Sequence, residues 1–169
     1  LRDARGWRVP VADLRRGEQR KVVVRVRVHA TVATQDILTV DWAYRDLAGA
    51  AQGQRAVARA VVTEDATLVE RHADPAALQL IEQARTARAL EDAATAYAGG
   101  DGQRANQILV DRQAAMQGFA GKLDKKAYAD LEEATVRAAR DFAEAPAASA
   151  PAGLRAVKGN RASSFDMAH

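Results

Sequence analysis

The chain has 169 residues, a formal net charge of +3, no cysteine and an aromatic fraction of 5%. The lack of cysteine excludes disulfides, thiolate catalysis and Cys-ligated zinc or iron–sulfur sites. No apolar run approaches the roughly 20 residues of a membrane span. This length suits one medium domain or two small subdomains sharing a core of Ala and Val.

The first half of the chain alternates like β-strands. Residues 6–14 predict a short edge strand, because Pro10 cannot donate to a ladder. Residues 20–30 predict the clearest strand, which places Val22, Val24, Val26 and Val28 on one face. One face of this strand would therefore be core and the other mostly solvated.

Two further strands are expected downstream. Residues 36–46 alternate Leu38, Val40, Trp42 and Tyr44 with polar side chains. The connection at 31–35 is too short for a crossover helix, so this strand should pair antiparallel to its predecessor. A loop over residues 47–54 and a fourth strand over 55–63 complete a sheet with one apolar face.

The second half repeats with helical spacing. Asp74 and Pro75 predict a helix start, and an apolar stripe follows in steps of three and four: Leu80, Ala84, Ala87, Leu90, Ala94 and Tyr97. The glycine-rich turn at 99–102 ends this helix and begins the next. Gly118 and Gly121 interrupt the chain again, after which Asp124 caps a third helix.

The predicted fold class is α+β: an antiparallel four-stranded sheet or partial β-sandwich, followed by a three-helix up-down-up bundle. The β subdomain would span residues 1–66 and the helical subdomain 74–144. Residues 145–169 would form a Pro/Ala linker and a basic tail, either a short docking helix anchored by Phe165 and Met167 or a disordered segment. Because residue 1 is Leu, we expect a fragment or processed product of a longer protein.

The pattern predicts no catalytic, cofactor-binding or metal-ligating residue. His29, His72 and His169 lack the i, i+4 spacing that brings two ligands together on a helix. Acidic pairs such as Glu91 and Asp92 fall on expected helix surfaces. The turn at 99–102 follows a helix rather than a strand and lacks a Lys-Ser/Thr, so it does not match a phosphate-binding loop. The chain is therefore expected not to be an enzyme.

Arginines on the strands form a candidate anion-binding face. Its members are Arg25, Arg27, Arg45 and Arg59, with Arg55 beside them. Sheets that bind nucleic acid usually add exposed aromatics for base stacking, but Trp42 and Tyr44 belong to the opposite, apolar face. We therefore favour a solvated or salt-bridged face, with binding of an anionic polymer such as nucleic acid as the alternative.

The order of these segments resembles a known family. Two segments resemble the region that follows the von Willebrand factor A (VWA) domain in bacterial VWA proteins. The first is residues 9–28, in which Gly17-Glu18-Gln19-Arg20 precedes a valine strand, and the second is residues 38–46, which contain Val40-Asp41-Trp42-Ala43-Tyr44-Arg45-Asp46. Residues 93–109 resemble the same family's Ala-rich helical hairpin, whose spacing is similar to one tetratricopeptide unit. The resemblance covers most of residues 7–143.

The resemblance implies a VWA accessory region whose strands complete a β-sandwich beside the VWA domain. The metal-ion-dependent adhesion site of that domain needs an Asp-x-Ser-x-Ser loop, which this chain lacks, so its metal binding does not carry over. We expect a non-enzymatic protein-interaction module without a cofactor, in which the sheet face forms the core and the helical hairpin meets the partner. The partner would be another protein or the adjacent VWA domain, self-association stays open, and either the bacterial cell envelope (periplasm) or the cytoplasm fits.

Overall fold

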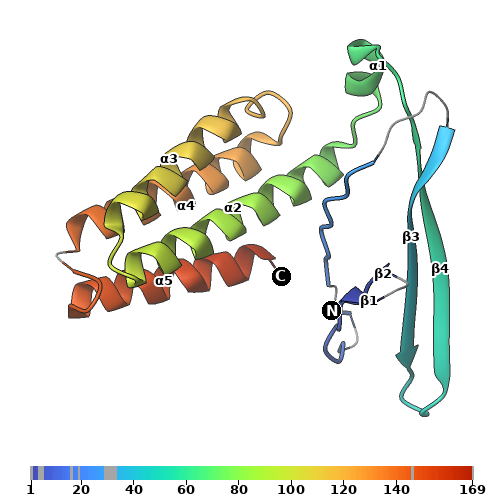
Figure 1. Cartoon of the computed structure of the whole chain (residues 1–169), viewed down its shortest axis with the longest axis horizontal. Coiled ribbons are helices and arrows are strands. Elements are labelled where there is room, and N and C mark those ends of the chain that lie inside the picture. Colours follow the sequence, from blue (N-terminus) through green and yellow to red (C-terminus); the bar gives the residue numbers. More distant parts are fainter. Residues whose placement is uncertain are drawn as a thin grey trace. The chain divides into compact units, whose positions relative to one another are not determined.

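The computed structural model describes residues 2–3, 6–15, 17–18, 20–28, 34–145 and 147–168 (Figure 1). The chain forms two compact units. One comprises residues 1–23 and 74–169, and the other comprises residues 24–73.

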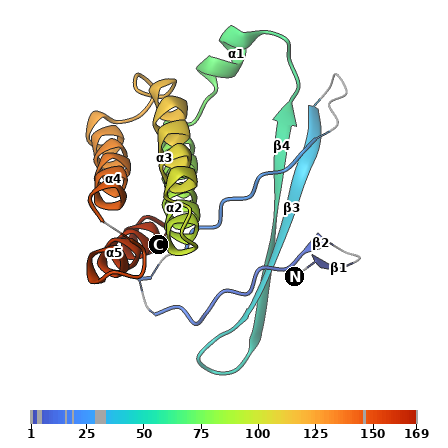
Figure 2. The same cartoon turned by 60° about the vertical axis from the view of Figure 1, so that its left-hand side comes forward.

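Four helices form the main body of the first unit. They are α2 (Pro75–Ala98), α3 (Gly102–Gln117), α4 (Lys125–Glu144) and α5 (Pro151–Ala168). Helix α2 packs against the other three, α3 also contacts α4, and α4 contacts α5 (Figures 1 and 2). The arrangement is a four-helix bundle, so the predicted three-helix bundle is wrong.

The caps that start these helices were readable from the sequence. The carboxylate of Asp74 accepts hydrogen bonds from the backbone N–H groups of Ala76 and Ala77, at 2.9 and 3.3 Å. Asp101 and Asp124 cap α3 and α4 in the same way. An Asp side chain at this position satisfies N–H groups that have no partner within the helix. The predicted starts of these three helices are confirmed.

The C-terminal segment, for which the sequence allows a docking helix or a disordered tail, forms helix α5 and packs against the bundle. Its buried side carries small or polar residues, namely Gly153, Ala156, Val157, Asn160 and Ser164. The Ser164 hydroxyl donates to the Ala87 carbonyl of α2 at 2.9 Å. Small side chains let two helices approach closely but leave a weak hydrophobic pattern in the sequence. Met167 packs against the bundle core, whereas Phe165 is 60% exposed.

The bundle core is built largely from alanine around a few large side chains. Leu90 and Leu109 are fully buried, and the rings of Tyr97 and Phe142 stack with centroids 4.6 Å apart. The Tyr97 hydroxyl also donates to the Ala145 carbonyl at 3.0 Å. The remaining members of this cluster are Ala93, Ala94, Ala105, Ala134, Ala138, Ala156 and Val157. The helices thus bury their apolar stripes against one another.

The strands differ most from expectation. Over the residues that the structure describes, the strands form two separate antiparallel pairs: β1 (Arg2–Asp3) with β2 (Gly6–Trp7) in the first unit, and β3 (Thr34–Arg45) with β4 (Ala51–Val61) in the second. The second unit also contains a short helix, α1 (Ala66–Arg71), capped by Asp65. The predicted four-stranded sheet or partial β-sandwich is wrong.

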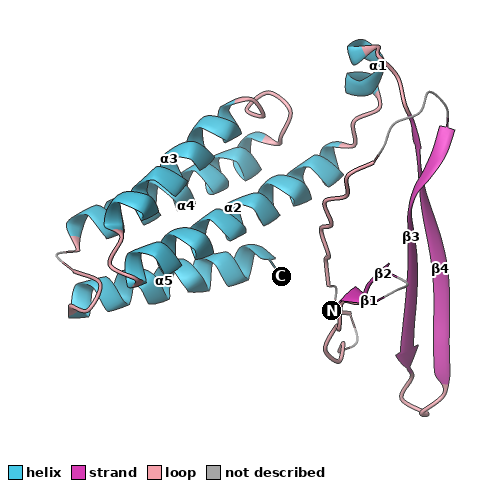
Figure 3. Cartoon of the chain, in the orientation of Figure 1, coloured by secondary structure: helices cyan, strands magenta, loops and turns pink. Residues whose placement is uncertain are grey.

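The valine-rich segment explains the difference. Residues 20–28 form irregular backbone rather than a strand (Figure 3). The valine side chains between Val22 and Val28 are 40 to 55% exposed. Positions 29 and 30 of the predicted strand lie outside the described residues. Alternation gives a segment one apolar face, but a strand also needs a partner with free backbone groups. Here β3 pairs with β4 instead of with its predecessor in the chain.

Candidate interaction surface on the hairpin

A tightly hydrogen-bonded loop connects β3 to β4. The Gly49 N–H donates to the Asp46 carbonyl at 2.9 Å, and Gly49 has a φ of 83°, which favours glycine. The Asp46 carboxylate accepts from the Ala48 and Ala50 N–H groups at 3.0 and 2.9 Å and from the Gln52 side chain at 3.1 Å. The hydrogen bond from Gln52, followed by those from the backbone, lowers the pKa of Asp46.

One face of the hairpin carries no charge and is open to solvent. Side chains of directly opposed residues in an antiparallel pair lie on the same face, so Leu38, Val40, Trp42 and Tyr44 share a face with their β4 partners Ala58, Ala56, Gln54 and Gln52. Val40 and Trp42 are each 42% exposed and Tyr44 is 56% exposed. We call these eight residues the uncharged face. The prediction that these β3 side chains form a sheet core is not met within the hairpin.

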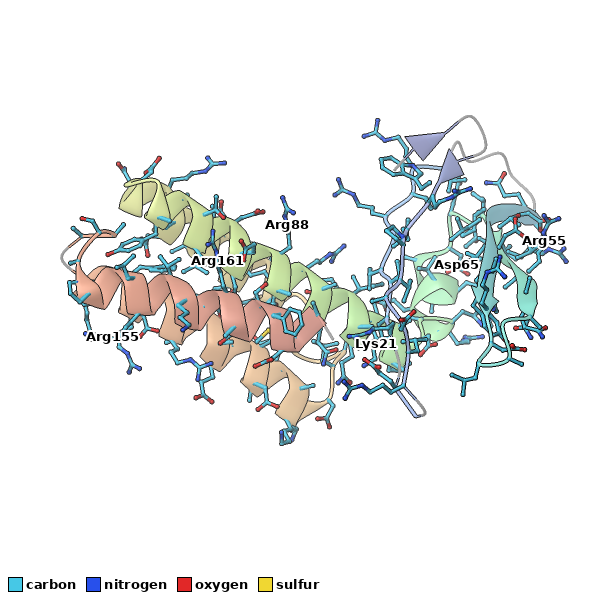
Figure 4. All side chains as sticks on the ribbon, turned by 90° about the horizontal axis from the view of Figure 1, so that it is seen from below. Lys21, Arg55, Asp65, Arg88, Arg155 and Arg161 are labelled. Carbon is cyan, nitrogen blue, oxygen red and sulfur yellow. The ribbon has the colours of Figure 1, made fainter. Side chains whose placement is uncertain are left out.

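The opposite face carries paired charges. Arg55 makes two hydrogen bonds to the Asp41 carboxylate, at 2.6 and 3.1 Å, and Arg59 bonds Asp36 at 2.7 Å. The hydrogen bond from Arg55 lowers the pKa of Asp41, and each carboxylate raises the pKa of its arginine. These are exposed pairs, which contribute little to stability but order the side chains. Arg55 is labelled on the hairpin in Figure 4.

The four arginines of the predicted anion-binding face occupy two kinds of position. Arg45 and Arg59 lie on the charged face of the hairpin, where Arg59 bonds Asp36 and Arg45 donates to the Gly49 carbonyl at 3.2 Å. Arg25 and Arg27 are exposed on the irregular segment 20–28. The structure therefore brings only Arg45 and Arg59 together on one sheet face, and the Asp36 carboxylate neutralises Arg59.

A second polar cluster lies inside the helical bundle, and sequence reasoning missed it. Glu82 of α2 is fully buried and Arg112 of α3 is 7% exposed. The Arg112 guanidinium donates to the Glu82 carboxylate at 2.6 Å and to the Thr86 hydroxyl at 3.0 Å. The partly exposed Arg85 donates to the other Glu82 oxygen at 2.6 Å.

A sequence signal for this cluster did exist. Stepping back from Leu90 by four residues reaches Thr86 and then Glu82, and Arg112 lies three residues after Leu109. Charged side chains on two apolar stripes predict a buried ion pair. Because the pair is saturated by its own partners and closed to solvent, it can hold α2 and α3 together but cannot reach a substrate.

The hollows on the helical unit also mix charges of both signs. One of them has a volume of about 510 Å³ and is lined by Asp124, Asp130, Lys126 and Arg137, among others. Lys126 bonds Asp130 at 2.8 Å, and this hydrogen bond raises the pKa of Lys126. The acidic and basic side chains of this lining therefore neutralise one another and do not form a cluster of carboxylates around one point.

Comparison with known proteins found no matching family model, no similar curated protein and no similar solved structure. Within the described ranges, no group of three or more His, Cys, Asp or Glu side chains is arranged to hold a metal ion. Of the helices in those ranges, none is both long and apolar enough to traverse a membrane. The most distinctive accessible feature is therefore the uncharged face of the hairpin.

Proposed function

We propose that this chain is a non-enzymatic accessory module that binds a neighbouring folded domain through the uncharged face of the β3–β4 hairpin. The observation that carries the proposal is the exposure of Val40, Trp42 and Tyr44 in a row along one strand. Isolated two-stranded hairpins are marginally stable in water, and exposed apolar surface with aromatic side chains is typical of binding sites. A partner that covers this face would stabilise the hairpin as it binds.

The resemblance of residues 9–28, 38–46 and 93–109 to the segment after a VWA domain supports an adjacent VWA domain as the partner. The uncharged face differs from the surface first expected to meet a partner, the helical hairpin. The helices pack their apolar stripes against one another, whereas the hairpin leaves its stripe open. The hairpin is therefore the better candidate for the contact.

Binding by the separately expressed upstream domain of the parent protein tests this proposal. Isothermal titration would compare the unchanged chain with a Trp42→Ser variant. Buried aromatic anchors at interfaces contribute about 2 kcal/mol or more, so affinity should fall by about 30-fold. A Val57→Ser variant is the matched control, because Val57 is 46% exposed on the opposite face; its affinity should change less than about twofold.

Two results would refute the proposal. One is a parent protein without a VWA-like domain upstream, and the other is equal binding by the Trp42→Ser and unchanged proteins. The alternative function, binding of an anionic polymer through the arginines, is weakened by the carboxylate partners of Arg55 and Arg59. It predicts affinity for DNA, RNA or polyphosphate that falls steeply with salt concentration.

A further inference from the structure

The end of β3 is complementary to itself. Residues 41–45 read Asp-Trp-Ala-Tyr-Arg, with opposite charges at the two ends and an aromatic residue next to each. If two such segments lie antiparallel with Ala43 at the centre, Asp41 stands opposite Arg45 and Trp42 opposite Tyr44. Each of these pairings occurs twice, because the arrangement is symmetric.

The outer edge of β3 can accept such a partner. Among the strands of the described ranges, β3 pairs with β4 alone, so its other side presents backbone N–H and C=O groups. All five residues from Asp41 to Arg45 are exposed. Natural edge strands are commonly protected against pairing by Lys, Pro or a β-bulge. Strand β3 contains neither Lys nor Pro over its 12 residues, and its irregularity lies between Asp36 and Leu38, outside the segment 41–45.

We propose that two copies of this chain associate by antiparallel pairing of their β3 edges, centred on Ala43. The pairing keeps each side chain on its own face, because Asp41 and Arg45 lie on the charged face and Trp42 and Tyr44 on the uncharged face. The two hairpins then form one continuous sheet. Opposite charges and aromatic pairs placed directly across an antiparallel ladder are both stabilising.

The charges of Asp41 and Arg45 favour this register over the registers centred on adjacent residues. Centring the pair on Asp41 or on Arg45 would place two like charges directly opposite each other, which destabilises a ladder. Centring on Trp42 or on Tyr44 leaves Asp41 and Arg45 without each other as partners. Among symmetric registers centred within this segment, the one at Ala43 therefore places both opposite charges and both aromatic rings directly across the ladder, in addition to the contacts that Asp41 and Arg45 make within their own hairpin.

The contact is short, and its expected strength follows from that. Five paired residues span about 17 Å, so the buried area lies in the range of weak, transient interfaces. Dimers should appear at high micromolar concentrations. The association does not depend on the proposed function, because it requires the purified chain alone and leaves the uncharged face open.

A charge-swap experiment in the analytical ultracentrifuge tests the pairing. An Arg45→Glu variant and a double Asp41→Arg/Arg55→Asp variant should each stay monomeric, since both place like charges opposite each other in a homodimer. The second change in the double variant restores a cross-strand ion pair within the hairpin. An equimolar mixture of these two variants should dimerise again, because opposite charges then face each other. The control Arg104→Glu, which changes an exposed helical arginine, should dimerise like the unchanged chain.

Cysteine cross-linking gives an independent readout, because the chain has no cysteine of its own. Ala43→Cys should form an intermolecular disulfide at least tenfold faster than Ala51→Cys, a control on β4 that is exposed on the same face. Directly opposed residues lie within disulfide range. A chain that stays monomeric at millimolar concentration, unimpaired dimerisation of Arg45→Glu, or equal cross-linking of the two cysteine variants would overturn the proposal.

Discussion

Replacing one member of the buried Glu82–Arg112 pair should destabilise the helical unit severely, while replacing both should not. Glu82→Met leaves the Arg112 guanidinium buried with the Thr86 hydroxyl and a backbone carbonyl as its remaining partners. Leaving one charge of a buried pair uncompensated typically costs about 3–5 kcal/mol. We expect the upper end for Glu82→Met, because no carboxylate then remains among the contacts that Arg112 makes.

Arg112→Met should cost less, about 3 kcal/mol, because Arg85 still donates to the Glu82 carboxylate at 2.6 Å from a partly exposed position. The double variant replaces both charges with unbranched apolar side chains that adapt to irregular space. Its stability should lie within about 1 kcal/mol of the unchanged protein, which gives a large coupling energy in a double-mutant cycle.

Urea unfolding followed by far-ultraviolet circular dichroism measures these differences, because the helical signal comes mainly from α2 to α5. A single domain is commonly stable by about 5–15 kcal/mol, so Glu82→Met should unfold at a much lower urea concentration. The reasoning is refuted if either single variant costs less than about 1 kcal/mol, or if the double variant loses the sum of the two single losses.

Three further predictions concern other parts of the fold. Gly153→Ala should cost about 1–3 kcal/mol, because an added Cβ would clash with the backbone carbonyl oxygen of Ala147. Gly159→Ala on the same helix meets no neighbouring atom and should stabilise by about 0.5–1 kcal/mol; equal thermal shifts for the two variants would contradict this. The lowered pKa of Asp41 means that its ion pair stabilises the hairpin fully above the unfolded-state pKa of about 4, and that this stabilisation is lost as the pH falls through the lower folded-state pKa. Arg55→Gln should raise the pKa of Asp41 in a carboxyl NMR titration, and an unchanged titration would count against the pair. Tyr97→Phe should lose about 1 kcal/mol in urea unfolding, because it removes a hydrogen bond to a backbone carbonyl, and an unchanged midpoint would show that this bond is not stabilising.

The sequence by itself determined the helices that depend on local signals. Asp74, Asp101 and Asp124 each bond N–H groups two or three residues onward, so these caps can be read without knowing the rest of the fold. The loop between β3 and β4 was expected as well, but over residues 47–54, whereas β4 already begins at Ala51 and ends at Val61. Alternation along residues 36–46 likewise identified the two faces of β3, because side-chain direction in a strand has a period of two.

Only the tertiary structure decided which segments meet. Val22 to Val28 alternate as well as β3 does, yet the ladder forms between β3 and β4, because pairing depends on a partner's position rather than on the pattern of one segment. Helix α5 docks through Gly153 and Ser164, whose small side chains carry little hydrophobic signal. The spacing from Leu90 and Leu109 places Glu82 and Arg112 on the apolar stripes of their own helices, but only the packing of α2 against α3 decides that the two charges meet, 30 residues apart in the sequence.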